Sequence, residues 1–193
     1  MSSPDTRKII ADAAISLFMQ NGYDGTSISD IRKASGATTG SIYHFFTNKA
    51  GLAIAIWQDA IGGWQSCFET LKASDKPEDQ IKATVHSLLI WARANPSHFR
   101  VYDEILSLSR SLTAFEQIRD SVERGHAVSA GMYADWAAKG AVRNHPWHIA
   151  RALMIGPSLE ALRAAEHLTE TDIAALVEAA WDAVTASARS RPG

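Results

Sequence analysis

Residues 27–46 read Ser-Ile-Ser-Asp-Ile-Arg-Lys-Ala-Ser-Gly-Ala-Thr-Thr-Gly-Ser-Ile-Tyr-His-Phe-Phe, a pattern that divides into a capped helix, a turn and a second short helix. The Ser27 hydroxyl can cap the first helix, and Asp30 stands in the capping-box position three residues later. Gly36 can adopt the left-handed conformation that ends this helix, and Thr38 can cap the next one. This arrangement is typical of a helix-turn-helix unit.

The second helix of this unit is expected to have one apolar and one polar side. Ile42 and Phe46 are four residues apart and are predicted to face the core. Helix-turn-helix units place this helix in the major groove of DNA. Hydroxyl and imidazole groups on its outer side can bond phosphates or base edges, and the helix carries no Lys or Arg. The outer positions are Thr39, Gly40, Ser41, Tyr43 and His44.

Composition and charge fit a globular protein with an asymmetric charge distribution. Of the 193 residues, 46% are hydrophobic and 21% are charged, and no apolar run is long enough for a membrane-spanning helix. The formal net charge of -2 argues against binding nucleic acid through bulk electrostatics. Residues 1–50 nevertheless hold five basic and four acidic side chains, a less negative balance than in the rest of the chain, which suits an N-terminal DNA-facing module. The N-terminus has no export signal pattern, which predicts a cytoplasmic protein without a membrane partner.

Apolar residues recur at spacings of three and four along the whole chain, which predicts an all-α fold of about nine helices. The first helix is expected to begin near Pro4 and to end at Asn21-Gly22. A polar loop is expected at residues 73–77, and Pro96 is expected to open a helix. The first helix is predicted to bury Ile9, Ala13, Ile15, Leu17 and Phe18.

Several motifs together resemble the TetR family of transcription regulators: Gly22-Tyr23-x-Gly-Thr-Ser-Ile-x-Asp-Ile, the Gly36 turn, Gly40-Ser-Ile-Tyr-His-Phe-Phe, and Lys49 followed by Leu52. The resemblance covers about residues 6–55. It implies a three-helix DNA-binding head at residues 1–48 and a ligand-binding and dimerisation body at residues 49–193. The family's DNA contacts carry over to Ser27, Ser29, Thr38, Thr39, Gly40, Ser41, Tyr43, His44 and Lys49.

Two consequences of the resemblance concern single basic residues. Lys49 would be the phosphate anchor that links the head to the body. Arg32 departs from the family, which usually has a small alanine there, and it either contacts phosphate or stays solvated. The resemblance also implies a repressor whose two heads change their spacing when a small molecule binds.

The middle of the chain is rich in aromatic residues, which is typical of a pocket for an aromatic or extended apolar effector. Ordinary core packing remains the favoured interpretation for any one of these residues. Cys67 is the only cysteine, so an intrachain disulfide is excluded. The predicted pocket residues are Trp64, Cys67, Trp91, Phe99, Tyr102, Met132 and Trp136.

Two C-terminal segments predict a homodimer. Residues 147–163 mix large and small apolar side chains, with Pro157 expected to kink the helix or to mark its restart. Thr169 and Asp172 form a second capping box ahead of an apolar stripe, and the two helices can form a four-helix interface. The predicted interface residues are Leu153, Leu159, Leu162, Ile173, Leu176, Val177, Ala180, Trp181 and Val184.

Catalytic and metal signatures are missing from the sequence. There is no Gly-x-Ser-x-Gly elbow, phosphate loop or His-Glu-x-x-His motif, and His145 and His148 have no further ligand beside them. The sequence therefore predicts no enzyme, no metal and no cofactor. It predicts a DNA-binding regulator, a repressor released from a palindromic double-stranded DNA operator by a small apolar or aromatic effector. The alternative is a DNA-tethered protein whose body binds a protein partner.

Overall fold

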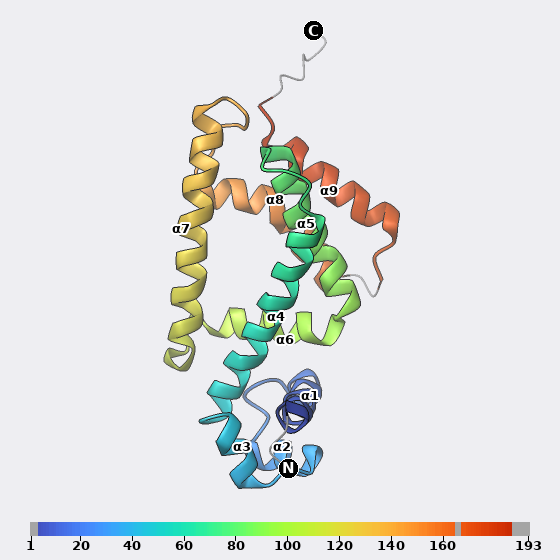
Figure 1. Cartoon of the computed structure of the whole chain (residues 1–193), viewed down its shortest axis with the longest axis vertical. Coiled ribbons are helices and arrows are strands. Elements are labelled where there is room, and N and C mark those ends of the chain that lie inside the picture. The colour runs from blue at the N-terminus through green and yellow to red at the C-terminus, as the bar shows by residue number, and fades with distance from the viewer. Residues whose placement is uncertain (1–3, 165–166, 187–193) are drawn as a thin grey trace. The chain divides into compact units, whose positions relative to one another are not determined.

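A computed structural model of the chain describes residues 4–164 and 167–186, and Figure 1 shows its helices. Within this part of the chain there are nine α-helices, one short 3-10 helix and no strand, so the predicted all-α fold is confirmed. None of the described helices is long and apolar enough to cross a membrane. The elements are α1 Pro4–Asn21, α2 Ile28–Ser35, α3 Thr39–Phe45, α4 Lys49–Leu71, α5 Pro77–Ala94, α6 Pro96–Leu108, η1 Thr113–Phe115, α7 Glu116–Ala138, α8 Trp147–Ala164 and α9 Glu170–Val184.

The chain forms two compact units. The N-terminal unit comprises residues 1–62 and 95–122, and the C-terminal unit comprises residues 63–94 and 123–193. Helices α4 and α7 each contribute one part to either unit. The N-terminal unit therefore holds α6 and η1 beside α1, α2 and α3. The predicted boundary at residue 48 separates an expected DNA-binding head from the rest of the chain and does not coincide with these packing units. This functional boundary stays a prediction.

Helix α1 packs against α2, α3 and α6 within the N-terminal unit. Its buried side is formed by Ile10, Ala14 and Phe18, with Ile15 beside them. Ile9 is 51% exposed, so its predicted place in the core is wrong. Successive residues of a helix point about 100° apart, and the pair Ile9-Ile10 can therefore place only one side chain inward.

The C-terminal unit is built on α5, α8 and α9, which pack against one another and lie side by side in Figure 1. Pro157 lies inside α8, so the helix continues through this proline instead of restarting there. The buried core combines apolar side chains of all three helices with two from the α7 region: Ile81, Val85, Leu89, Tyr133, Val142, Ala150, Met154, Ile173, Val177, Ala180 and Val184.

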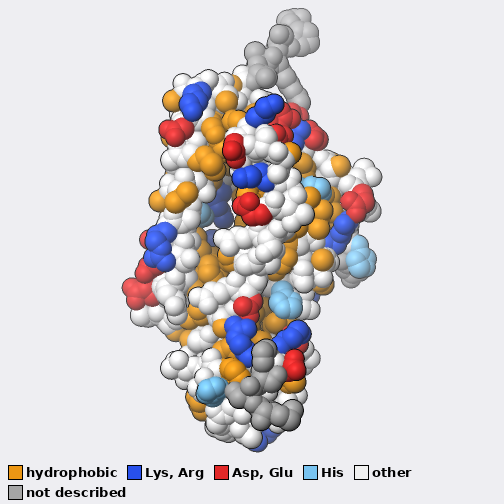
Figure 2. Space-filling view, in the orientation of Figure 1, with side chains coloured by type: hydrophobic (Ala, Val, Ile, Leu, Met, Phe, Trp, Pro, Cys, Tyr) orange, Lys and Arg blue, Asp and Glu red, His pale blue; other side chains and the backbone are white. Residues whose placement is uncertain are grey.

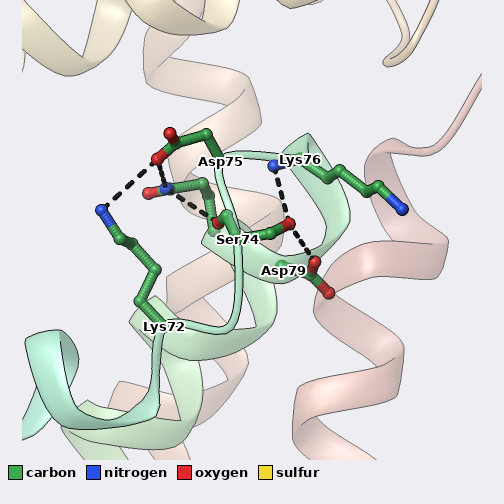
Figure 3. A network of polar contacts seen from close by, with 6 residues as sticks. Lys72, Ser74, Asp75, Lys76 and Asp79 are labelled. Carbon is green, nitrogen blue, oxygen red and sulfur yellow. Dashed lines mark hydrogen bonds and ion pairs between the residues drawn. The ribbon is translucent and has the colours of Figure 1, made fainter.

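The loop between α4 and α5 is held by its own side chains, as Figure 3 shows. The Ser74 hydroxyl bonds the Asp79 carboxylate at the start of α5. The side-chain amide of Gln80 donates to the Ser74 carbonyl and to the Asp75 carboxylate, each at 3.2 Å. Lys72 forms an ion pair with Asp75 at 3.4 Å. The predicted loop at residues 73–77 is confirmed, and these bonds give it a defined shape.

Candidate nucleic-acid interface

The first helix of the predicted helix-turn-helix unit begins and ends as the sequence predicts. The Ser27 hydroxyl accepts from the Asp30 backbone N–H at 3.2 Å, and the Ser27 backbone N–H donates to the Asp30 carboxylate at 3.1 Å. Hydrogen bonds from the Ser27 side chain and backbone hold the pKa of Asp30 below its usual value. Gly36 follows the helix with φ +67°, the left-handed conformation expected of a helix-ending glycine.

The second helix of the unit, α3, is capped by Thr38 and anchored by two apolar side chains. The Thr38 hydroxyl accepts from the Ser41 backbone N–H at 3.0 Å and lies 2.9 Å from the Ser41 hydroxyl. Ile42 is fully buried and Phe46 is 4% exposed. The burial of Ile42 and Phe46 therefore confirms the predicted apolar side of this helix. The same packing fixes the orientation of the helix, so its opposite side faces away from the core.

The outer side of α3 faces solvent. Tyr43 is 52% exposed, and Thr39, Gly40 and His44 are also exposed, whereas Ser41 is half-buried. On α2, Ser29 is exposed as well. The structure thus leaves polar groups of α3 free to meet a partner. On the face of the molecule that Figure 2 shows, basic and acidic side chains are interspersed.

Lys49 is placed differently from the other predicted DNA contacts. It is half-buried, and its ammonium donates to the backbone carbonyls of Tyr23 at 2.9 Å and Thr26 at 3.0 Å. The same group lies 4.2 Å from the centre of the Tyr23 ring, within range of a cation–π contact. The predicted phosphate anchor is therefore bonded to the turn between α1 and α2.

Sequence reasoning missed the partners of that turn. The Tyr23 backbone N–H donates to the Glu104 carboxylate of α6 at 2.8 Å. The buried Tyr23 ring contacts Phe18 of α1 at 5.6 Å and Phe115 of η1 at 5.0 Å, between ring centres. Burial raises the pKa of Tyr23, and the nearby Asp24 charge adds to this effect. Tyr23 stands in a recognised motif, but no local pattern indicates contacts some 80 residues away.

The predicted pocket residues fall into both units. In the C-terminal unit, the indole N–H of Trp64 donates to the buried Ser87 hydroxyl at 2.9 Å. Cys67 and Trp136 are half-buried, and Met132 is 42% exposed. Trp91 is buried so close to Gly63 that a β-carbon there would lie 2.6 Å from the indole nitrogen. Trp64, Cys67, Trp91 and Trp136 are thus at least partly packed within this unit, and their place in a ligand pocket stays a prediction.

In the N-terminal unit, the predicted pocket residues Phe99 and Tyr102 are buried next to Trp57, an aromatic residue that is not among the predicted pocket residues. The rings of Trp57 and Tyr102 stack at 6.2 Å with 14° between their planes. Phe99 lies 6.4 Å from Tyr102 between ring centres. Trp57 is 5% exposed, and its indole N–H has no hydrogen-bond partner within the described chain. These three rings form an aromatic cluster on α4 and α6.

The predicted dimer residues also divide, and one group requires a correction. Ile173, Val177, Ala180 and Val184 lie in the chain's own core, where α5 and α8 cover them. They are therefore unavailable to a second chain, because α5 and α8 of the same chain already cover this apolar stripe. Leu162, Leu176 and Trp181 are partly buried against this core, Leu159 is half-buried, and Leu153 is 39% exposed.

Comparison with known proteins agrees with this geometry. The sequence model of bacterial regulatory proteins of the tetR family matches residues 10–56. The uncharacterized HTH-type transcriptional regulator YxaF of Bacillus subtilis (strain 168) is 48% identical over 140 residues, which are 71% of this chain and 69% of that protein. The HTH-type transcriptional repressor ComR of Escherichia coli (strain K12) is 44% identical over 50 residues, 26% of this chain and 24% of ComR.

The similarity in structure extends further along the chain. The crystal structure of a bacterial regulatory protein in the tetR family from Rhodococcus RHA1 superposes with a TM-score of 0.77 at 20% identity, and the match covers 96% of this chain and 100% of that one. By contrast, the shorter sequence matches span only about a quarter of the length of the curated relatives concerned. The structural match therefore shows that the fold is shared over nearly the whole chain, whereas these sequence matches are confined to a shorter segment.

A capped helix, a glycine turn and a short helix with a solvent-facing polar side define a protein of the helix-turn-helix class. Its sequence similarity to YxaF and to the family model narrows this class. The chain belongs to the tetR family of bacterial regulatory proteins.

Proposed function

We propose that the protein is a homodimeric repressor that binds a palindromic operator through α3 and is released by a small apolar or aromatic effector. The observation that carries this proposal is the division of α3 into two sides. Ile42 and Phe46 hold the helix in the core, and Tyr43 and His44 remain exposed. Because Tyr43 and His44 face solvent in the part of the chain that the structure describes, this side of the helix is suited to an external partner.

In the proposed complex, Thr39, Gly40, Tyr43 and His44 meet the major groove. The hydroxyls of Thr39 and Tyr43 can bond phosphates or base edges, and the His44 imidazole can do the same. The hydroxyls of Ser27 and Thr38 already accept helix-capping bonds, and the Ser41 hydroxyl bonds the Thr38 hydroxyl. We therefore assign these three residues mainly to the shape of the unit, and Ser29 to contact with the DNA backbone.

We place the dimer contact on the exposed side of α8. Ile149 is 41% exposed and Leu153 is 39% exposed, one turn apart on this helix. Gly156 follows on the same side, and its position has open space around it. The glycine allows two helices to approach closely across a two-fold axis, and the apolar side chains beside it supply contact area. On α9, the outer side chains rather than the buried stripe would complete the contact.

The effector is proposed to be apolar or aromatic with at least one hydrogen-bond acceptor. The aromatic cluster of Trp57, Phe99 and Tyr102 offers ring surface, and the Trp57 indole N–H has no acceptor within the described residues. A buried donor without a partner is costly, so a bound acceptor would stabilise it. Repression is proposed because ComR, whose name describes a repressor, is similar over 50 residues.

The test is selection of bound duplexes from a random DNA pool, followed by sequencing. We expect enrichment of one palindromic sequence whose half-sites lie about 34 Å apart, or a multiple of it, because each head of a dimer reads one half-site. Binding to this operator should weaken with salt, with a log-log slope of about -0.9 for each phosphate contact. An unenriched pool, or equal affinity for the selected and scrambled duplexes, would contradict the proposal.

A further inference from the structure

The part of α7 that belongs to the C-terminal unit has one side packed on its own chain and one side in solvent. On the packed side, Tyr133 is 2% exposed in the core of that unit, and the His126 ring lies 6.3 Å from that of Trp147 between ring centres. On the opposite side, Val128 is 74% exposed and Met132 is 42% exposed. These apolar side chains leave water only if something outside the chain covers them.

The exposed side of α7 also contains two glycines that its own chain does not require. Gly125 and Gly131 are both exposed, and a β-carbon at either position would meet no atom of the chain within 4 Å. Glycine is the least favourable residue for a helix interior after proline, so these positions weaken the helix. A missing side chain on an exposed helix side lets a second backbone approach closely.

Charged side chains stand at the two ends of this side. Arg124, Val128, Gly131 and Asp135 follow at intervals of four, three and four residues, which places them in one row along the helix. Arg124 and Asp135 are both exposed. They lie about 16 Å apart along the helix axis. Figure 2 shows hydrophobic and uncharged surface between charged groups along this part of α7. This outer row therefore has a basic end, an apolar middle and an acidic end.

The outer row of α7 is complementary to itself. Its centre lies midway between Val128 and Gly131, and Arg124 stands as far before that centre as Asp135 stands after it. When a second α7 lies antiparallel across this centre, Val128 of each helix faces the open space at Gly131 of the other. In the same arrangement Arg124 faces Asp135 at both ends, and opposite charges meet.

The positions beside the outer row follow the same rule. Met132 faces Ala127 of the antiparallel copy, and Ala134 faces Gly125, so a larger side chain meets a smaller one each time. A two-fold contact between identical chains presents the same surface twice and requires this kind of symmetry, whereas a contact with an unrelated partner does not. A parallel copy would set Arg124 against Arg124, which like charges disfavour.

We propose that α7 binds α7 of a second copy of this chain in an antiparallel two-fold contact, with Val128 of each copy over Gly131 of the other and Arg124 paired with Asp135 at both ends. This contact is separate from the proposed dimer contact on α8. Two such contacts on different surfaces join two dimers into a tetramer, in which the α7 contact forms twice. The inference goes beyond the proposed function and rests on the proposed dimer only for the size of the assembly.

The small size of the contact suits a tetramer that forms reversibly from dimers. One pair of helices in contact over about three turns covers less than the roughly 800 Å² that each partner contributes to a standard stable interface. Two α7 contacts that form together support each other, because the first raises the local concentration for the second. The tetramer therefore dissociates to dimers on dilution, and it brings two pairs of DNA-binding heads into one assembly.

The experiment measures the assembly state of the full-length protein by sedimentation velocity, from low to high micromolar concentration. Gly131→Leu fills the space that Val128 of the second copy needs, without a clash in its own chain. Arg124→Glu and Asp135→Arg each set like charges against each other, and the double reversal Arg124→Glu/Asp135→Arg restores opposite charges. We expect each single variant to weaken tetramer formation about tenfold or more, and the double reversal to return within about threefold of wild type.

Two further variants separate this contact from other effects. Glu123→Arg is the matched control, because it reverses an exposed charge of α7 a third of a turn away from Asp135, and it should associate like the wild type. Leu153→Glu tests the α8 contact and should leave pairs of chains joined through α7. Circular dichroism establishes that each variant is folded. If Gly131→Leu does not fold, the charge reversals at exposed positions still decide the outcome.

The outcomes distinguish the α7 contact from the proposed dimer. A wild type that never exceeds a dimer, but becomes monomeric in Gly131→Leu, keeps the α7 contact and overturns the dimer contact on α8. A monomeric wild type overturns both. Association that is insensitive to Gly131→Leu and to Arg124→Glu, or a double reversal that associates no better than the single reversals, overturns the α7 contact alone.

Discussion

Helices α3 and α9 are both capped by a threonine, but they use their two sides in opposite ways. Helix α3 buries Ile42 and leaves Tyr43 and His44 in solvent. Helix α9 buries a long stripe that includes Ile173 and Val184 against its own chain. The sequence of a helix shows which side is apolar, but it does not show what covers that side. In α3 the side proposed to contact DNA is the exposed one, whereas in α9 the conspicuous apolar side is buried in the chain's own core.

The largest expected effect comes from breaking the buried stripe of α9. Ile173 is 1% exposed, and Ile173→Ala should lower the free energy of unfolding by about 2–5 kcal/mol through lost burial and a cavity. The matched change Ile9→Ala on α1 removes a side chain that is 51% exposed and lies outside the proposed contacts between chains, so it should cost much less. Denaturant unfolding at fixed protein concentration measures both. Equal losses in the two variants would mean that α9 is not the core helix.

Two glycines of the helix-turn-helix unit, Gly36 in its turn and Gly40 in α3, should respond to alanine in opposite directions. Gly36 has φ +67°, a conformation that costs an alanine about 1–2 kcal/mol, and no neighbouring atom adds a clash. Gly40 lies inside α3 without a positive φ, and alanine there should stabilise the helix by up to about 1 kcal/mol. Thermal unfolding of the two variants compares them. A stabilised Gly36→Ala variant would contradict the turn geometry.

The cap of α9 provides a test of the structural side. The Thr169 hydroxyl accepts from the Asp172 backbone N–H at 3.2 Å, and the Asp172 carboxylate accepts in return. Thr169→Ala should lower the free energy of unfolding by about 1 kcal/mol without changing operator affinity. An unchanged unfolding midpoint would show that α9 does not depend on its cap.

The smallest expected effect is a pH dependence of the stability that the two capping boxes contribute. Hydrogen bonds from Thr169 hold the pKa of Asp172 below its usual value, as those from Ser27 do for Asp30. The unfolded chain then binds more protons between the lowered and the usual pKa. This contribution to stability is therefore present at neutral pH and is lost as the pH falls through the lowered pKa. The stability of Asp172→Asn should consequently approach that of the wild type in acid. A difference in unfolding free energy between the two proteins that stays constant with pH would contradict this cause.

The local features of the helix-turn-helix unit could be predicted from the sequence because each depends on residues within one or two turns. The capping pair Ser27 and Asp30, the Gly36 turn and the cap at Thr38 all belong to this class, and all are confirmed. The anchors Ile42 and Phe46 follow from helical periodicity in the same way. The helix-turn-helix class of the protein could therefore be predicted from interactions between residues that are close in sequence.

The features that sequence reasoning missed depend on contacts between distant segments. Lys49 bonds a turn 23–26 residues before it, and Glu104 bonds Tyr23 across 81 residues. The choice between Ile9 and Ile10 likewise required the position of the neighbouring helices. For α9, periodicity located the stripe correctly, but the assignment of its partner to a second chain needed the packing of α5 and α8.

The central claim is that the exposed side of α3 reads DNA and contributes little to the fold, and Tyr43 tests it most directly. The measurement pairs operator affinity with the free energy of unfolding for wild type, Tyr43→Phe and Tyr43→Ala. Because Tyr43 is 52% exposed, we predict unfolding free energies within about 0.5 kcal/mol of wild type. We also predict operator affinity lowered about tenfold or more in Tyr43→Ala, with Tyr43→Phe in between if the hydroxyl makes a contact. Wild-type operator affinity in Tyr43→Ala would contradict the claim.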